Sequence, residues 1–448
     1  MQKDFTLAVT GDSIINRRIS VYTDPRFLSL IKILRDADVA FTHLETVIHD
    51  YEGPEVYPAA EGGGTWMRSP SFVAEELKWA GFDIVSHASN HCLDYSYGGL
   101  KATWKALDEA GLPYAGTGQN LGEAREPTYL ETDKGRVALI SMSSSFTRWG
   151  RAGEARRDVK GRPGLNPLRF YYVVDAKTME MLRELTIKLG LGVWQKDKVL
   201  LFYPQGATNT VCKFVEGDEP GVTPVADEDD VEGNLRSIRD ARMQADYVII
   251  QIHTHEFEGA TNIPAKFIPP FAKACIDAGA DVFVAEGSHA PIRGIEIYQN
   301  KPIFYDPGDF MFMSNTVTRL PHDFYVRSQQ GPAIRSRQWE ATTSEAFDDR
   351  IVAKKAWQEL NPPREYVGKG IGGCVIAVCT FGEDKKLTGL KLHPVSVVGG
   401  FLGMGPSCGL PMQADAEAAK NIISCFTELS APFGTKIEFM EGVGVVKL

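Results

Sequence analysis

The chain lacks any Cys-x-x-Cys pair, and its 7 cysteines are scattered over 448 residues. An odd number of cysteines without such pairs predicts neither a disulfide framework nor a thiolate zinc site. No apolar run approaches the roughly 18 residues that a membrane-spanning helix needs, and the first residues show no basic leader before a long apolar stretch. We therefore expect a cytoplasmic protein without a membrane anchor.

An excess of positive charge is also missing. The formal net charge is -10 and the sequence pI is about 5.5, and no basic stripe with interleaved aromatic residues occurs. These features argue against a general nucleic-acid binder. The composition, 43% hydrophobic and 24% charged residues, is typical of an ordinary globular chain with material for one large domain or for a domain plus appendages.

Strand-like apolar runs alternate with helix-like segments through residues 1–142, and the alternation resumes near residue 246. Helical spacing of apolar residues marks 27–35, 71–80, 100–110 and 267–278. This alternation predicts an α/β fold with a parallel or mixed sheet covered by helices. We expect the main domain to span residues 1–320.

Two segments depart from this rhythm. Residues 143–235 contain an irregular, arginine-rich stretch, a helix-like stretch at 176–189 and a polar acidic part, which predicts an insertion that could close over a substrate as a lid. Residues 321–448 are polar at first and then show strand-like and helix-like runs. We expect them to form a small α/β extension that packs on the core.

Residues that bind metals follow several of the predicted strands. Five of the 9 histidines fall at these strand ends, together with carboxylates and an amide, in the segments Gly11-Asp12, His43-Leu44-Glu45, Ser89-Asn90-His91, His253-Thr254-His255 and Glu286-Gly287-Ser288-His289. Because α/β sheets place their chemistry at the carboxyl ends of strands, residues far apart in the chain are expected to converge on one pocket.

Each residue type suits a metal-dependent site, although each also has a structural interpretation. Asp12 offers a hard oxygen ligand, but an aspartate after a strand can also cap the next helix. The amide of Asn90 can ligate a metal while the adjacent His91 acts as an acid or base. His253 and His255 lie two apart on a strand, so both point to the same face and form a metal half-site.

Several motifs together resemble a known family. They are Thr10-Gly11-Asp12, His43-Leu44-Glu45-Thr46, Ala88-Ser89-Asn90-His91-Cys92-Leu93-Asp94, Gly116-Thr117-Gly118-Gln119-Asn120, Gly279-Ala280-Asp281 and Tyr305-Asp306-Pro307-Gly308-Asp309-Phe310. Over residues 5–315 the chain resembles the CapA/PgsA-type proteins of poly-γ-glutamate capsule synthesis, which belong to the calcineurin-like metallophosphoesterase superfamily. The resemblance implies a four-layer αββα sandwich of two mixed sheets flanked by helices.

The resemblance also implies a divalent metal, which could be Mn, Zn, Fe or Mg. Glu45, Asn90 and His253 are the expected ligands, with His255 and Glu286 as further candidates. Three positions depart from the superfamily pattern, because Ile14 and Glu286 stand where histidines are usual and His255 is an added histidine. One ion and two ions are therefore both open. The expected catalytic residues are Asp12, His91 and His289.

A bound divalent ion favours hydrolysis, because it lowers the pKa of a bound water from ~15.7 towards ~7. Guanidinium groups match carboxylates bidentately, so Arg148, Arg151, Arg162 and Arg169 indicate an anionic, peptide-like or glutamyl substrate, unless they only form a solvated loop. Our first hypothesis is a metal-dependent hydrolase that acts on an amide bond or a phosphoester.

Two other hypotheses remain. Cytoplasmic relatives include epimerases that invert the C-terminal residue of lasso peptides, and here Asp12 and His289 could serve as the acid and the base. A non-catalytic module that holds an acidic polymer is the third. The sequence does not indicate the oligomeric state.

Overall fold

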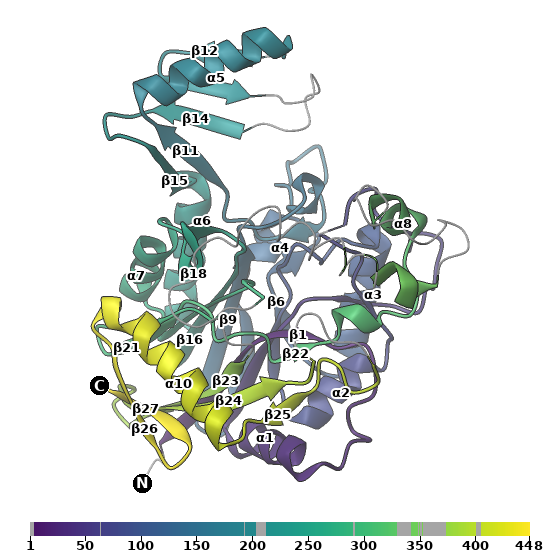
Figure 1. Ribbon diagram of the computed structural model, residues 1–448, viewed down its shortest axis with the longest axis vertical. Coiled ribbons are helices and arrows are strands. Elements are labelled where there is room, and N and C mark those ends of the chain that lie inside the picture. The colour runs from purple at the N-terminus through teal and green to yellow at the C-terminus, as the bar shows by residue number, and fades with distance from the viewer. Residues whose placement is uncertain are drawn as a thin grey trace.

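The computed structural model describes residues 4–62, 64–191, 193–202, 212–289, 292–328, 342–347, 349, 352, 373–399 and 405–448. Parts of the predicted insertion (192 and 203–211) and of the predicted C-terminal extension (329–341, 348, 350–351, 353–372 and 400–404) lie outside the described residues. The α/β class predicted from the sequence is confirmed, since helices and several sheets alternate along the chain (Figure 1).

The larger sheet is built around the first strand of the chain. Its order is β26-β27-β24-β23-β1-β2-β5-β6, and β22 and β25 pair with β1 and β24. The strands are β1 (Phe5–Ile14), β2 (Val39–Leu44), β5 (Ile84–Ser86), β6 (Tyr114–Ala115), β22 (Met311–Phe312), β23 (Cys374–Phe381), β24 (Leu387–Val397), β25 (Pro411–Gln413), β26 (Lys436–Met440) and β27 (Val443–Lys447). β23 pairs antiparallel with β1, so residues near the C-terminus continue the sheet in which the chain begins.

The second sheet has the order β20-β21-β19-β16-β9-β8. Its strands are β8 (Thr128–Thr132), β9 (Gly135–Ser143), β16 (Tyr247–His253), β19 (Val282–Glu286), β20 (Ile295–Tyr298) and β21 (Lys301–Phe304). β16 lies parallel to both β9 and β19, and all seven of its residues are buried. Full burial explains why this strand reads as a nearly continuous apolar run in the sequence.

One apolar core joins the two sheets, and helices cover their other faces. Side chains of β1, β2 and β23 pack with side chains of β9, β16 and β19 in a single buried cluster. Helices α1 (Pro25–Asp36), α2 (Val73–Ala80) and α3 (Ser96–Glu109) pack beside the larger sheet, whereas α6 (Glu228–Arg242) and α7 (Ile268–Ala278) pack on the second one (Figure 1). α10 (Ala416–Ser430) contributes to the core between the sheets.

A five-stranded sheet projects from this body, at the top of Figure 1. Its order is β12-β13-β14-β11-β15, with β11 (Phe170–Val174), β12 (Val193–Lys196), β13 (Val199–Phe202), β14 (Cys212–Glu216) and β15 (Val222–Ala226). Helix α5 (Ala176–Leu189) packs on it through a small apolar cluster of its own. This inserted sheet lies within the segment 143–235, where the sequence predicts an insertion.

The remaining elements are short. They are β3 (Val47–Ile48), β4 (Arg68–Ser69), β7 (Thr117–Gly118), α4 (Leu121–Arg125), η1 (Arg148–Gly150), β10 (Gly164–Leu165), β17 (Phe257–Glu258), β18 (Ala260–Pro264), η2 (Ser314–Thr316), α8 (His322–Ser328) and η4 (Ala431–Phe433). In the part of the chain that the structure describes, no helix has both the length and the apolar character that a bilayer crossing requires.

Candidate metal centre

The carboxyl ends of two strand pairs, one in each main sheet, meet at the candidate site. β1 and β2 run parallel with Asp12 opposite His43, and β16 and β19 run parallel with His253 opposite Glu286. The rings of His43 and His253 stack across the two sheets with their centroids 5.0 Å apart. These four side chains therefore lie together at the carboxyl ends of their strands, where α/β sheets place their chemistry.

Loops that follow the strands add the next side chains. Glu45 comes directly after β2, and its Oε1 lies 3.3 Å from Nε2 of His289, 3.5 Å from Nε2 of His253 and 3.8 Å from Nε2 of His91. Nδ1 of His253 lies 3.7 Å from Oδ1 of Asp12 and 3.4 Å from Oε1 of Glu286. Side chains as far apart in the chain as Asp12 and His289 thus contribute to one cluster.

His255 and Asn90 complete the predicted set. The Nε2 atoms of His253 and His255 lie 3.0 Å apart. Two nitrogen ligands of one tetrahedral ion, each about 2.0–2.1 Å from the ion, lie roughly 3.3 Å from each other, so this spacing suits a shared ion. Asn90 is buried in the turn after β5, next to His91, and its role as a ligand stays a prediction.

Buried polar atoms without a hydrogen-bond partner concentrate in this cluster. Among the described residues they include Oδ1 and Oδ2 of Asp12, both carboxylate oxygens of Glu45, Nε2 of His43, Nδ1 of His253 and Oε2 of Glu286. Buried polar groups in folded proteins are nearly always hydrogen-bonded. Seven oxygen and nitrogen atoms without a hydrogen-bond partner in one place therefore fit one or two divalent cations, which accept lone pairs from such atoms.

The described residues form three overlapping groups, and within each group the possible ligand atoms lie within 4.8 Å of one another. They are Asp12, His43, His253 and Glu286; Glu45, His253 and His255; and Asp12, His289 and Asp309. Asp12 and His253 each belong to two groups, so either can bridge two neighbouring positions. The residues present fit one ion or two, and the number and identity of the ions stay predictions.

Burial shifts the pKa values of several side chains in this cluster. Burial, followed by the nearby carboxylates of Glu45 and Glu286, raises the pKa of Asp12 well above its ordinary value. Burial lowers the pKa of His43 to about 3 and that of His253 well below its ordinary value. A metal requires a neutral imidazole with a free lone pair, which the lowered pKa values of His43 and His253 provide. A cation would also relieve the repulsion among the carboxylates that raises the pKa of Asp12.

His289 is held by its backbone and by a carboxylate. Its φ of 55° lies in the left-handed region, which is uncommon for a histidine, and its Nδ1 lies 3.2 Å from Oδ1 of Asp309. Burial opposes protonation, but the charges of Glu45 and Asp309 outweigh it and raise the pKa of His289. Asp306 accepts hydrogen bonds from the backbone N–H groups of Ser288 and Gly308, so it ties together the two loops that carry His289 and Asp309.

His91 is oriented by a neighbouring carboxylate. Its Nδ1 donates to Oδ2 of Asp94 at 2.5 Å, and the same oxygen accepts from the backbone N–H of Met67. Burial disfavours the charged imidazole, but the carboxylate of Asp94 outweighs it and raises the pKa of His91. Nε2 is therefore the nitrogen of His91 that faces Glu45, and it is available for chemistry.

Side chains behind the cluster hold the candidate ligands. Nδ1 of His43 pairs with Oγ of Ser86 at 2.8 Å, and Nε2 of Gln251 donates to Oε1 of Glu286. Such partners fix the tautomer and the orientation of a ligand, and they leave its other donor atom for the ion.

Replacing Ser86 by alanine is therefore expected to weaken metal binding by roughly 10- to 100-fold, because the ring of His43 loses the partner that orients it. The affinity is measured by competition with a chromophoric chelator. Ser29→Ala, on the outer helix α1, serves as the control. Equal affinities for the two variants would show that the contact between Ser86 and His43 does not support metal binding.

His43 and Asp309 are site residues that the predicted set omits. His43 lies two positions before Glu45 at the end of β2, and alternation along a strand places both on one face. Asp309 follows Gly308 in the loop between β21 and β22. For His43 the sequence carries a signal, a metal-binding residue type at a strand end, and its omission is one of selection. Asp309 lies beyond the strand end, and its closeness to His289 depends on how two loops meet.

The four predicted substrate-binding arginines occupy a different position. Arg148, Arg151, Arg162 and Arg169 all line one cavity of about 810 Å³ between the inserted sheet and the body. Arg169 forms ion pairs with Asp227 and Asp230, so its charge is already balanced. Substrate binding by these arginines stays a prediction.

A family comparison supports the resemblance seen in the sequence. The model of the family described as "Bacterial capsule synthesis protein PGA_cap" matches residues 6–314. This stretch holds every residue of the cluster, from Asp12 to Asp309, and the whole inserted sheet.

Individual relatives agree with the family match. The chain is 34% identical to the uncharacterized protein y4sH of Sinorhizobium fredii over 447 residues, which cover 99% of this chain and 93% of the relative. It is 25% identical to the capsule biosynthesis protein CapA of Bacillus anthracis, over 68% of this chain and 59% of that protein. A probable polyglutamine synthesis accessory protein of Mycobacterium tuberculosis is 28% identical over 50% of this chain and 44% of its own length.

Proposed function

Because the chain belongs to the family of bacterial capsule synthesis proteins, we propose that it is a metal-dependent hydrolase that cleaves an amide bond, or alternatively a phosphoester, of an anionic peptide-like or glutamyl substrate. The family resemblance also supports the finer description of the fold as a metallophosphoesterase-like sandwich. Two sheets that share a core, with helices on their outer faces, are compatible with that description.

The set of unpaired donor atoms at the strand ends carries this proposal. Asp12, Glu45, His43, His253 and Glu286 would hold the ion through those atoms. When bound, a divalent ion supplies Lewis-acid polarisation of a substrate oxygen and a water nucleophile at neutral pH. The partners Ser86 and Gln251 keep the ligand side chains in the orientation that this requires.

His91 is the proposed proton carrier. Asp94 fixes the ring through Nδ1, so that Nε2 faces the interior of the cluster, 3.8 Å from Glu45. In this position the protonated imidazole can donate a proton to the leaving amine as the amide bond breaks. His289, which Asp309 holds through Nδ1, has its Nε2 3.3 Å from the same oxygen of Glu45 and can bind the carbonyl oxygen of the substrate or assist in proton transfer.

The anionic character of the substrate rests on the arginine-lined cavity and on the names of relatives. Relatives are described as capsule biosynthesis and polyglutamine synthesis accessory proteins, and we extend a glutamyl substrate class to this chain by that similarity.

A cytoplasmic location remains part of the proposal. It is tested by cell fractionation, in which recovery of the protein in the membrane or periplasmic fraction would contradict it.

The epimerase hypothesis meets a geometric difficulty. An acid and a base on opposite faces of an α-carbon must each lie about 3 Å from it, so they are roughly 6 Å apart. Nδ1 of His289 and Oδ2 of Asp12 are only 3.7 Å apart. Asp12 also belongs to two of the groups of described residues that could hold an ion, so we favour hydrolysis over an epimerase in which Asp12 and His289 form the acid–base pair. The non-catalytic module remains a third candidate, and it predicts no tightly held metal.

Incubation of the metal-loaded protein with blocked glutamyl peptides in deuterated water distinguishes these functions. Hydrolysis predicts a new amine end, detected by mass spectrometry, without deuterium at the α-carbon of the intact peptide. Deuterium at that carbon without cleavage would support epimerisation instead. An unchanged peptide, together with protein that holds no metal, would support the binding module.

A further inference from the structure

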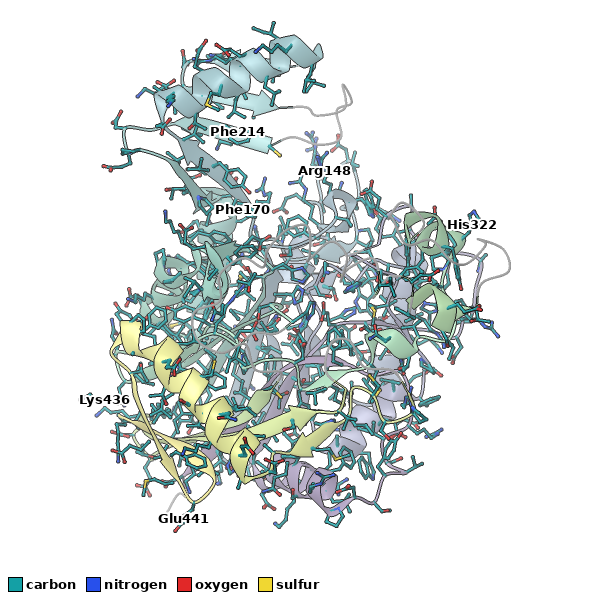
Figure 2. All side chains as sticks on the ribbon, in the orientation of Figure 1. Arg148, Phe170, Phe214, His322, Lys436 and Glu441 are labelled. Atoms are coloured by element: carbon teal, nitrogen blue, oxygen red, sulfur yellow. The ribbon has the colours of Figure 1, made fainter. Side chains whose placement is uncertain are left out.

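The cavity beside the inserted sheet is a second built feature of the molecule. It is about 810 Å³ in volume and is lined mainly by cationic and aromatic side chains, among them Arg148, Arg151, Lys213, Phe170, Tyr171 and Tyr172. In Figure 2, Arg148 and Phe170 lie where the inserted sheet joins the body, and Phe214 lies farther out in that sheet. A cavity of this size has room for a drug-sized ligand.

The walls carry an excess of positive charge. Of the described residues, no carboxylate forms an ion pair with Arg148, Arg151, Arg162 or Lys213, and Nη2 of Arg148 is buried without a hydrogen-bond partner. Among the described residues of the lining, the only acidic one is Asp227, and it pairs with Arg169. Cations crowded together in this way repel one another, and an anionic ligand relieves the repulsion.

Aromatic rings form much of the rest of the cavity wall. Phe170 stacks on Phe267 with centroids 5.1 Å apart, and Tyr172 stacks on Phe214 at 5.6 Å. Nζ of Lys213 lies 4.0 Å from the ring centre of Tyr171. These contacts hold the rings in place, so the cavity offers fixed apolar surface between the cations. A fully hydrated anion gains nothing from such surface, whereas an anion beside an apolar group does.

One loop connects the cavity with the metal centre. Oγ of Ser145 accepts from the backbone N–H of His255 at 2.8 Å and donates to the carboxylate of Glu256. Phe146, the next residue, lines the cavity. Successive Cα atoms are ~3.8 Å apart, so the cavity wall begins one residue from a direct contact with a candidate metal ligand.

We propose that this cavity binds a segment of an acidic peptide in which two or more carboxylates flank an apolar side chain. Guanidinium forks take the carboxylates, and the aromatic wall takes the apolar side chain. The inference rests on the proposed function in one respect, namely that the bound segment is the non-reacting part of the substrate. Binding energy from such a segment positions the bond that is cleaved at the metal centre.

Calorimetric titration of the full chain with N-acetyl-Glu-Phe-Glu amide tests the proposal. The Gln-Phe-Gln and Glu-Gly-Glu counterparts are expected to bind at least about 10-fold more weakly, because each lacks one half of the recognised chemistry. Arg148→Gln and Arg151→Gln are each expected to weaken binding of the first peptide by roughly 10- to 100-fold. Arg148→Lys, which keeps the charge but loses the fork, should fall between Arg148→Gln and the unaltered protein.

Arg156→Gln is the matched control, because Arg156 lies in the same loop but pairs with Asp158 on the surface, with 77% of its side chain exposed. An effect of this control as large as that of Arg148→Gln would overturn the proposal. Equal binding of the Gln-Phe-Gln peptide, or tighter binding of phenyl phosphate than of the acidic peptide, would also overturn it.

The titration is repeated with chelator and with His253→Ala, so that cavity binding is separated from the metal centre. Peptide affinity that survives both treatments supports the cavity as the site, even if no peptide is cleaved, and in that case only the proposed hydrolase function fails. Affinity that disappears with the metal would locate the peptide at the metal centre and contradict the cavity proposal.

Discussion

Replacing His253 by alanine is expected to abolish stoichiometric metal binding, with an affinity more than about 100-fold weaker than that of the unaltered protein. Loss of a partner that only orients a ligand lowers metal affinity by about 10- to 100-fold, and His253 is itself a candidate ligand in two of the overlapping groups. Its removal therefore affects every arrangement in which Glu45 or Glu286 shares an ion with it. Elemental analysis of protein purified without chelators measures the metal content, and chelator competition measures the affinity.

His322→Ala is the control for this variant, because His322 is an exposed histidine on α8. Circular dichroism and the thermal midpoint establish that both variants are folded. Metal content that stays unchanged in a folded His253→Ala protein would remove His253 from the ligand set. The same loss of metal in both variants would point to histidine-mediated binding at the surface.

Replacing His91 by alanine is expected to lower kcat by about 10²- to 10⁴-fold while the metal content stays the same. A positioned general acid contributes this much, and His91 is absent from the groups of described residues that bring three or more donor atoms together. The rate is measured as the release of a new amine from a blocked glutamyl peptide, at saturating substrate and with the metal content determined in parallel.

Asp94→Asn is the companion variant, because the ring then loses the carboxylate that holds Nδ1 and raises its pKa. It is expected to lower kcat less than His91→Ala does. An unchanged kcat in His91→Ala would rule out proton transfer by this residue. A loss of metal equal to the loss of rate would instead make His91 a ligand.

The body of the fold was predictable because its strands are buried on both faces. Burial makes β16 and β19 read as short apolar runs, and helical spacing of apolar residues marked α1 and α7 to within a few residues. The α/β class and the gathering of Asp12, Glu45 and His253 at strand ends follow from these local patterns together with the general rule for such sheets.

The pairing of strands far apart in the chain was much harder to predict from the sequence. Nothing local indicates that β23 lies antiparallel to β1, more than 350 residues earlier, because register depends on partners distant in the chain. The inserted sheet was also missed as a sheet, since β11 and β14 are only half-buried and their residues alternate weakly. The omission of Asp309 has a similar cause, because its closeness to His289 depends on how two loops are tied together by Asp306.

Anomalous diffraction from crystals grown with Mn²⁺ would show whether the donor atoms at the ends of the two sheets surround a cation. We expect an anomalous peak within bonding distance of at least three of the atoms of Asp12, Glu45, His43, His253 and Glu286 that have no hydrogen-bond partner. These side chains well ordered with no peak among them, or a single peak bound elsewhere on the molecule, would contradict this expectation.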